Sequence, residues 1–371
     1  MRVLHVFKTF YPDSFGGVEQ VIRQIMLSAK PLGVNSRVFT LSKATRRARM
    51  VCDGMAEVIQ APTDIDIAST PISFSAAAPF REATEWADII HYHYPWPFGD
   101  LLHLTARPRK PCLVTYHSDV VRQKVLLQFY RPLMRRFLSS VDAIVATSPN
   151  YASSSEVLND YADKVSVIPI GIQEASYPTP GVERTEYWRS RLGNDFFLFV
   201  GVIRYYKGLH ILLDAIARAP FKVVVVGAGP LEQELKSQAE RLQLKNIVFL
   251  GALPEEDKVV LLRLCYAVVF PSHLRSEAYG ITLLEGAMSG KPLISSEIGT
   301  GSSYINQNGE TGIVVAPDNP MAFRAAMETM QRHPEQARAM GANARKRFEA
   351  LFTADRMAAS YVALYRDIAS R

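Results

Sequence analysis

The stretch Phe270-Pro-Ser-His-Leu-Arg-Ser-Glu-Ala-Tyr-Gly-Ile-Thr-Leu-Leu-Glu285 decides the fold, because a strand, a loop and a helix follow one another in it. Residues 267–270 (Ala-Val-Val-Phe) form a short continuous apolar run, typical of a strand buried on both faces. Gly280 marks the start of a helix predicted over 281–289. A helix that begins directly after a buried strand offers its first amides to an anion, and its dipole adds to the attraction. These amides belong to Ile281, Thr282 and Leu283.

The same alternation of strands and helices continues on both sides of this stretch. In the second half we expect strands at 196–202, 222–226, 247–250, 267–270, 292–295 and 312–315, and helices at 209–219, 231–242, 257–264 and 281–289. In the first half we expect strands at 2–9, 36–41, 89–93, 112–117 and 143–146, and helices from residue 18 and over 120–138. Strands joined by helices form a parallel sheet that is covered on both faces. The sequence therefore predicts an α/β protein with two doubly wound, Rossmann-like domains in tandem.

Length and composition agree with two domains. The chain has 371 residues, 48% of them hydrophobic and 21% charged, which is ordinary globular composition. Residues 173–186 include Pro178, Pro180 and Gly181 and have the composition of a linker between domains at 1–172 and 187–352. Residues 353–371 are predicted to form a C-terminal helix that could pack back on the first domain. Because parallel sheets bind ligands beyond the carboxyl ends of their strands, we expect both carboxyl edges to face a cleft between the domains.

The sequence argues against a secreted or membrane-spanning protein. The longest nearly apolar run, residues 259–270, is interrupted by Arg263 and falls short of the roughly 20 residues that a spanning helix needs. The N-terminal residues alternate apolar and polar side chains and lack the apolar core of a signal peptide. Cys52, Cys112 and Cys265 do not have the spacing of a zinc site. We therefore expect a cytoplasmic protein with reduced thiols, associated at most with the inner face of the cytoplasmic membrane.

Glu277 and Glu285 lie on either side of the predicted anion site. A carboxylate beside a phosphate is repelled by it, so each glutamate would need to accept hydrogen bonds from ligand hydroxyl groups. A nucleotide sugar carries such groups on both sides of its diphosphate, the ribose on one and the hexose on the other. Taken singly, either glutamate could instead cap a helix or lie on its solvated face.

The chain also carries glycine-rich and polar motifs, each at a predicted strand-to-helix edge. They are Gly16-Gly17, Tyr116-His117-Ser118-Asp119, residues 199–208 (Phe-Val-Gly-Val-Ile-Arg-Tyr-Tyr-Lys-Gly), Gly227-Ala-Gly-Pro230, and Pro271-Ser272 ahead of Glu277-x7-Glu285. In this order they resemble the retaining glycosyltransferases of family 4, which have the GT-B architecture. The likeness is greatest to bacterial mannosyltransferases of O-antigen and lipopolysaccharide assembly, and it covers essentially the whole chain.

The resemblance assigns the donor to the second domain. Arg204 and Lys207 follow a predicted strand and would neutralise the leaving diphosphate, although Val202 stands where many members have the arginine. By the same resemblance, Glu277 would hold hydroxyl groups of the donor sugar and Glu285 those of the ribose. The further donor contacts that it implies are with Gly16, Gly17, Gly227, Gly229, Ala252, Leu253, Tyr279, Gly280, Ile281, Thr282 and Leu283.

On the first domain, the resemblance gives His117 a contact with the donor sugar near its reacting carbon. Asp119, two residues further on, could orient His117 or bind the acceptor. His93, near the end of another predicted strand, and Lys8 are further candidates for the acceptor side.

No metal ion or other cofactor is expected. Asp64-Ile-Asp66 matches the pattern of metal-dependent glycosyltransferases, but it lies in a predicted loop bounded by Pro62 and Pro71. A dinucleotide-binding dehydrogenase is disfavoured because Glu232 replaces the third glycine of its fingerprint.

The helix predicted over 120–138 is amphipathic and basic. Its cations are Arg122, Lys124, Arg131, Arg135 and Arg136. A helix of this kind can lie on an anionic membrane, but a core helix with a solvated basic face has the same pattern. The net charge of +6 is modest and no stacking platform of aromatic residues interleaves with the bases, so no nucleic-acid partner is expected.

Taken together, the residues and the resemblance predict an enzyme that transfers mannose from GDP-mannose to a lipid-linked saccharide with retention of configuration. The base and the sugar come from the resemblance alone, so a UDP-hexose or a GDP-6-deoxyhexose is an alternative donor. Two functions of other classes stay open. A nucleotide-sugar epimerase would need no acceptor, and a non-catalytic glycan-binding scaffold would consume no nucleotide sugar.

Overall fold

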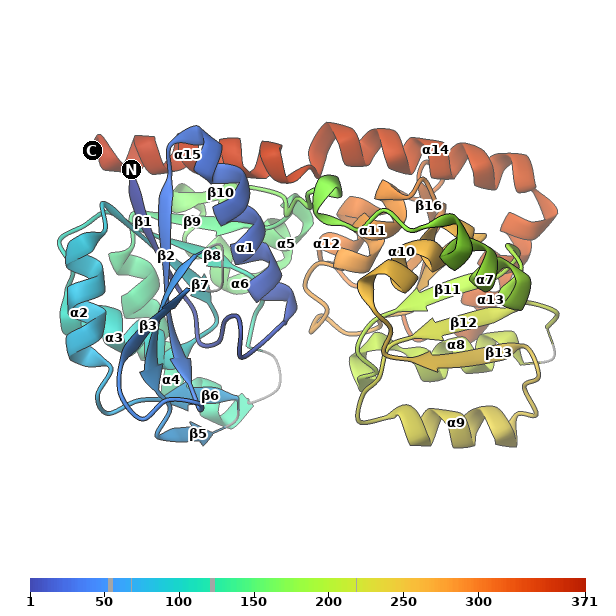
Figure 1. Cartoon of the computed structure of the whole chain (residues 1–371), viewed down its shortest axis with the longest axis horizontal. Coiled ribbons are helices and arrows are strands. Elements are labelled where there is room, and N and C mark those ends of the chain that lie inside the picture. The colour runs from blue at the N-terminus through green and yellow to red at the C-terminus, as the bar shows by residue number, and fades with distance from the viewer. Residues whose placement is uncertain (53–55, 68, 121–123, 218) are drawn as a thin grey trace. The chain divides into compact units, whose positions relative to one another are not determined.

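The computed structural model describes residues 1–52, 56–67, 69–120, 124–217 and 219–371 (Figure 1). The chain divides into two compact units. Unit 1 consists of residues 1–172 and 354–371, and unit 2 consists of residues 173–353. The predicted α/β class with two doubly wound sheets is confirmed.

Unit 1 is built on one large sheet. Its elements are β1 (Arg2–Val6), α1 (Gly17–Ala29), β2 (Asn35–Ser42), β3 (Arg49–Cys52), β4 (Glu57–Pro62), β5 (Ile65–Ile67), β6 (Thr70–Ile72), α2 (Ala77–Trp86), β7 (Ile89–Tyr94), α3 (Pro97–Ala106), β8 (Cys112–Tyr116), α4 (Lys124–Ser140), β9 (Ala143–Ala146), α5 (Pro149–Ser154), α6 (Glu156–Asn159), β10 (Val165–Val167) and α15 (Ala354–Ala369). The strand order is β10-β9-β8-β7-β1-β2-β4-β3, and neighbouring strands are parallel except for β3, which is antiparallel to β4. β5 and β6 form a separate small hairpin.

The C-terminal helix α15 belongs to unit 1, where it packs on α1 (Figure 1). It buries two tyrosines whose hydroxyl groups bond to side chains of the sheet. Tyr365 bonds to His91 of β7 at 2.7 Å, and Tyr361 bonds to Thr115 of β8 at 2.8 Å. These polar contacts fix the helix over the middle strands.

Unit 2 has a purely parallel sheet. Its elements are α7 (Val182–Leu192), β11 (Phe197–Val200), α8 (Leu209–Ile216), β12 (Val223–Val226), α9 (Glu232–Arg241), β13 (Ile247–Gly251), α10 (Glu255–Leu264), β14 (Ala267–Phe270), α11 (Ile281–Met288), β15 (Leu293–Ser296), α12 (Gly301–Ile305), β16 (Gly312–Val315), α13 (Pro320–Arg332) and α14 (Pro334–Leu351). The strand order is β13-β12-β11-β14-β15-β16. The order reverses at β11, which lies between β12 and β14, and ligands of such sheets bind at this point.

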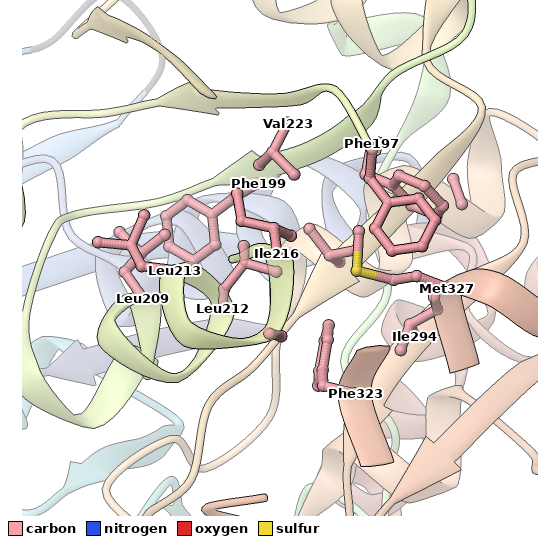
Figure 2. Close-up of a cluster of buried hydrophobic side chains, with 14 of the residues drawn as sticks. Phe197, Phe199, Leu209, Leu212, Leu213, Ile216, Val223, Ile294, Phe323 and Met327 are labelled. Atoms are coloured by element: carbon pink, nitrogen blue, oxygen red, sulfur yellow. The ribbon is translucent and has the colours of Figure 1, made fainter. Parts of the chain in front are cut away.

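A hydrophobic core holds the strands of unit 2 to their helices. Figure 2 shows Phe197 and Phe199 of β11 packed with Leu212 of α8, and with Phe323 and Met327 of α13. All five side chains are buried, and each contributes roughly 1.5–3 kcal/mol to folding by leaving water. This core fixes the positions at which the strands end and the loops of the site begin.

Two details differ from the sequence prediction. Residues 173–186, predicted as a linker, belong to unit 2, and α7 already begins at Val182. Residues 49–72 hold the four short strands β3 to β6, none of which we expected. No helix in the described part of the chain is both long and apolar enough to cross a bilayer.

Candidate active site

The loops at the carboxyl edge of the unit 2 sheet are held together by glycines. A Cβ at Gly227 would overlap the carbonyl oxygen of Gly201, and one at Gly208 would overlap that of Pro271. Both glycines also have positive φ angles, 134° and 69°, which side chains disfavour. The loops after β11, β12 and β14 therefore approach one another as closely as main chains can.

The helix start predicted after Gly280 is observed, and the anion site expected there stays a prediction with one change to its amides. Gly280 has φ 100° and precedes the first helical residue. The amides of Ile281 and Thr282 begin the helix, where no preceding helical carbonyl can reach them. The amide of Leu283 is not free, because it donates to the Gly280 carbonyl at 2.9 Å. The prediction of a free amide at Leu283 was therefore wrong, since a tight first turn already uses that donor.

Lys207 and Glu277, from the loops after β11 and β14, form an ion pair. Only 12% and 11% of their side-chain surfaces are exposed, so water screens the pair weakly. Glu277 also accepts a hydrogen bond from the Ser272 hydroxyl at 3.2 Å. An ammonium group has three donors, so Lys207 can bind Glu277 and still offer protons to a diphosphate.

Arg204 differs from Lys207 in having no ion-pair partner among the described residues. It is exposed and precedes the short 3-10 turn Tyr205–Lys207. Val202, two residues earlier in the same loop, is 52% exposed. The phosphate contact assigned to Arg204 stays a prediction.

Glu285 of α11 lies in a second polar cluster that the sequence analysis did not find. It accepts hydrogen bonds from the Tyr177 hydroxyl at 3.0 Å and from Lys258 Nζ at 2.7 Å. Burial opposes the charge on Lys258, but Glu285 and Glu255 together hold its pKa above the usual lysine value. Burial, together with Glu285, raises the pKa of Tyr177, which stays a donor. A carboxylate has about four acceptor positions, so Glu285 keeps room for two ligand hydroxyl groups.

The remaining predicted donor residues of unit 2 have supporting positions. Tyr279 is buried, and a Cβ at Gly301 would overlap its ring. The Thr282 hydroxyl donates to the carbonyl oxygen of Val200 at 3.1 Å, so its proton is not available to a ligand, whereas its amide can donate. Gly229 approaches Ile203 closely, while Ala252 is exposed and Leu253 half-buried after β13.

Gly16 and Gly17 lie where α1 begins in unit 1, and a buried carboxylate accompanies them. Glu19 accepts hydrogen bonds from Thr9 at 2.8 Å and from Ser14 at 2.7 Å. A Cβ at Gly16 would overlap the carboxyl group of Glu19. The glycine thus lets Glu19 fold back and hold the loop before α1, a role that the sequence analysis missed.

The acceptor-side candidates are already engaged with protein groups. Lys8 Nζ donates to the carbonyl oxygen of Ser69 at 3.1 Å. Asp119 accepts hydrogen bonds from the hydroxyl groups of Tyr116, Tyr151 and Ser155 at 2.8 to 2.9 Å. It makes no hydrogen bond to His117, so it does not orient that ring directly. Its carboxylate instead fixes the loop that follows β8.

His117 directly follows β8 and is 6% exposed. Its Nε2 lies 3.0 Å from Nδ1 of His93. His93 itself is 1% exposed, and its other ring nitrogen is bonded to His5 at 3.1 Å. With both ring nitrogens engaged and the ring buried, His93 has no polar atom left for an acceptor. The direct acceptor contact predicted for it is therefore not supported.

Two family models and one long alignment identify the family. The model described as Glycosyltransferase Family 4 matches residues 15–175, and the one described as Glycosyl transferases group 1 matches residues 185–347. D-rhamnosyltransferase WbpZ of Pseudomonas aeruginosa is 56% identical over 354 residues, which are 95% of this chain and 93% of that protein. The chain belongs to glycosyltransferase family 4.

Other proteins are similar to this glycosyltransferase over nearly the whole chain. O-antigen chain mannosyltransferase C of Escherichia coli is 50% identical over 365 residues, 98% of each chain. Sucrose-phosphate synthase from Thermosynechococcus elongatus has a TM-score of 0.80 at 21% identity and covers 99% of this chain and 98% of its own. HepE from Anabaena, in complex with UDP and glucose, has a TM-score of 0.78 at 17% identity over 99% and 100% of the two chains. The structural likenesses show the fold, and the sequence likenesses show that the chain is a glycosyltransferase.

The basic helix of this glycosyltransferase is α4. Arg131, Arg135 and Arg136 are exposed, and Arg135 makes a long ion pair of 3.4 Å with Asp160. Phe129 of the same helix is 80% exposed and is not packed in the core. Arg122 lies outside the described residues, and only the backbone of Lys124 is described.

Proposed function

We propose that the chain transfers mannose from GDP-mannose to a lipid-linked saccharide, in the synthesis of O-antigen or a similar cell-surface polysaccharide. The observation that supports this most is the 50% identity to O-antigen chain mannosyltransferase C over 98% of both chains. Unit 2 supplies what a nucleotide-sugar donor requires, namely cations for a diphosphate and carboxylates for hydroxyl groups on both sides of it.

Different residues of unit 2 would bind different parts of the donor. Arg204 and Lys207 would bind the diphosphate and stabilise the charge that grows on it as the bond to the sugar breaks. Glu277 would accept hydrogen bonds from the hexose and Glu285 from the ribose. His117 of unit 1 would contact the sugar.

The transfer would proceed on one face of the sugar. The acceptor oxygen forms a bond to the anomeric carbon as the bond from that carbon to the diphosphate oxygen breaks on the same face, and the configuration is retained. The acceptor proton passes to the leaving diphosphate, so no protein nucleophile and no metal ion is required. The cations of unit 2 balance the two charges that remain on the nucleoside diphosphate.

D-rhamnose is the second candidate sugar, because D-rhamnosyltransferase WbpZ is 56% identical to this chain. D-rhamnose is mannose without its 6-hydroxyl group, so the two GDP-sugars differ by one hydrogen-bonding group. A site that bonds this hydroxyl group rejects the deoxy sugar by about 10⁴-fold or more, whereas an apolar pocket discriminates only about 10²-fold. The ratio of kcat/KM for the two donors therefore identifies both the sugar and the kind of pocket.

Thermal stabilisation of the purified chain tests the donor directly. A ligand at 100 times its Kd adds about 2.7 kcal/mol to the free energy of unfolding. We expect GDP and GDP-mannose to stabilise the chain, and UDP and ADP not to do so. Selective stabilisation by UDP-sugars would change the donor, and stabilisation by none of these nucleotides would contradict the proposal. Conversion of the donor into a different nucleotide sugar without acceptor would indicate an epimerase.

We also propose that α4 docks on an anionic membrane, where a lipid-linked acceptor would be found. Arg131 and Arg136 have no carboxylate partner among the described residues, and exposed Phe129 gives the same helix an apolar side chain to insert. Each such cation contributes about 1 kcal/mol near an anionic surface. Replacing Arg131, Arg135 and Arg136 with Ser should weaken binding to phosphatidylglycerol vesicles by at least tenfold. Unchanged binding would refute the docking.

A further inference from the structure

Four imidazole rings lie in a buried row on one face of the unit 1 sheet. His5 is in β1, His91 and His93 are in β7, and His117 follows β8. The register places His5 opposite His91, and His93 opposite the residue two before His117. The centroids of neighbouring rings are 4.2 to 5.4 Å apart, and all of these pairs are stacked except His5 and His91, which are tilted by 43°. The row therefore runs from the interior of unit 1 to the edge of its sheet.

Three of the four rings are joined by hydrogen bonds. His5 Nδ1 lies 3.1 Å from His93 Nε2, and His93 Nδ1 lies 3.0 Å from His117 Nε2. His91 lies beside this chain of bonds but is not part of it, because its two nitrogens bond to the hydroxyl groups of Tyr365 and Thr115. Neither nitrogen of His91 is thus left for a metal ion, although the cluster of histidines is close enough to suggest one.

Burial keeps these rings neutral. It lowers the pKa of His5 and of His117 to about 3, and it lowers the pKa of His93 well below its usual value. A neutral imidazole carries one N–H, so one ring nitrogen donates and the other accepts. His93 lies in the middle and must donate one of its two hydrogen bonds and accept the other. Both bonds therefore run in the same direction, and the tautomer of His117 is tied to that of His5.

The inner end of the chain of bonds decides the direction. His5 Nε2 is buried and has no hydrogen-bond partner. If the bonds ran inward from His117, this nitrogen would carry an unpaired buried N–H. If they run outward from His5, it carries only an unpaired lone pair. Unpaired buried N–H groups are rarer in proteins than under-satisfied acceptors, so the outward direction is favoured.

We propose that His5 and His93 are positioning residues that hold His117 as the Nδ1–H tautomer, so that its Nδ1 donates a hydrogen bond to the ligand. His117 Nδ1 has no partner among the described residues, and it is not one of the buried unpaired atoms of the structure. The ligand atom that it meets must then be an acceptor, such as a hydroxyl or phosphate oxygen. His117 cannot act as a base through this nitrogen. The assignment of that oxygen to the donor sugar rests on the proposed function.

Nuclear magnetic resonance of the full chain, labelled in its eight histidines, tests the tautomers without any substrate. Long-range couplings between ring nitrogens and carbon-bound protons distinguish a protonated from an unprotonated nitrogen. We expect His5, His93 and His117 all to carry the proton on Nδ1 at pH 7. A proton on Nε2 of His117 would overturn the proposal.

Matched variants test the positioning role. His93→Leu and His91→Leu each remove a buried imidazole from the same strand, but only the first interrupts the bonds to His117. We expect His93→Leu to leave His117 in mixed tautomers and to lower kcat/KM on the order of 10- to 100-fold, the range seen for partners that orient metal-binding histidines. His91→Leu should keep one tautomer and, per folded molecule, most of the activity. The amide of Asn in His93→Asn can place an N–H near the position of His93 Nδ1, so this variant should have a higher kcat/KM than His93→Leu.

The outcomes separate this proposal from the proposed function. Equal kcat/KM for the two leucine variants, or an unchanged His117 tautomer in His93→Leu, would overturn the positioning role. If the wild-type chain has the expected tautomers but turns over no GDP-sugar, the proposed function fails and the tautomer assignment stands. If His93→Leu does not fold, the tautomers of the wild-type chain and the activity of His93→Asn still decide.

Discussion

Replacing His5 with Asn should make the stability of unit 1 less sensitive to acid. Burial lowers the pKa of this histidine to about 3, whereas an unfolded histidine has a pKa of 6.5. As the pH falls below 6.5, the unfolded chain binds a proton that the folded chain does not bind. The stability that neutral His5 contributes is therefore fully present above pH 6.5 and is lost between pH 6.5 and about 3.

The size of the effect follows from these two values. Between pH 7 and pH 5, one such histidine removes about 2 kcal/mol from the free energy of unfolding, and His117, with the same lowered pKa, removes about as much again. His91 and His93 act in the same direction. Domain stabilities are about 5–15 kcal/mol, so the imidazole row should make unit 1 markedly acid-sensitive.

Urea titrations of the full chain at pH 7, 6 and 5 can measure this unit by unit. A labelling pulse with deuterium at one fixed pH reports unit 1 through peptides of β1, β7 and β8, and unit 2 through peptides of β11 and β14. The difference between pH 7 and pH 5 should be about 2 kcal/mol smaller in His5→Asn than in the wild type, for unit 1 only. Because the comparison is between two chains, titrating groups that do not interact with His5 cancel. An identical pH dependence of the two chains would refute the reasoning.

Three further predictions use other parts of the molecule. Gly208→Ala and Gly33→Ala both place a side chain at a left-handed backbone position (φ 69°, ψ 22° and φ 85°, ψ 20°), which costs about 1–2 kcal/mol. Only at Gly208 does the added Cβ meet a main-chain oxygen, so that variant should lose about 1–3 kcal/mol more in urea unfolding and also bind GDP more weakly. Equal losses would show that the close approach does not matter. Glu285→Gln keeps the size of the side chain but removes the charge beside Lys258. Because a charged hydrogen bond is worth roughly 1.5–3 kcal/mol, calorimetry should show donor affinity about 10- to 150-fold lower than in the wild type. Donor affinity equal to that of the wild type would show that Glu285 is not part of the donor site. Asp100→Asn tests a buried carboxyl group whose pKa burial raises to about 8, so that it stays protonated in the folded chain while it ionises above pH 4 in the unfolded chain. As the pH rises from 4 to 8, the free energy of unfolding of the wild type should therefore fall by up to about 1.4 kcal/mol per pH unit relative to the variant. Parallel pH curves for the two chains would contradict this.

The sequence was sufficient for the strands that are buried on both faces. β14 (Ala267–Phe270) and β12 (Val223–Val226) are continuous apolar runs, and each was predicted within one residue of its observed ends. β5 (Ile65–Ile67) has the sequence Ile-Asp-Ile and is exposed at all three positions. The pairing with β6 holds β5 in its extended conformation. Because no residue of β5 is buried, its sequence shows no alternation of buried and exposed side chains from which a strand could be predicted.

Individual candidate site residues could be predicted from the sequence, but the pairs that they form with one another could not. Lys207 and Glu277 are 70 residues apart in sequence, and they meet because β11 and β14 are neighbours in the sheet. Strand order is a property of the whole unit, and no local motif encodes it. Tyr177 and Lys258 were missed for the same reason, since each becomes recognisable only through its bond to Glu285. The spacing of His91 and His93, two residues apart in a buried strand, was the one local signal of the imidazole row.

The two units differ in the charge of the polar groups that they bury. Unit 2 buries charged groups and pairs them, as in Lys207 with Glu277 and Lys258 with Glu285, so cations remain available where a leaving diphosphate would develop negative charge. Unit 1 instead buries groups that stay neutral. A neutral imidazole at His117 can donate a hydrogen bond to an oxygen atom without adding a positive charge to the site. This arrangement makes unit 1 sensitive to acid. Burial keeps the histidines of the row neutral in the folded chain, whereas the unfolded chain exposes them and binds protons as the pH falls.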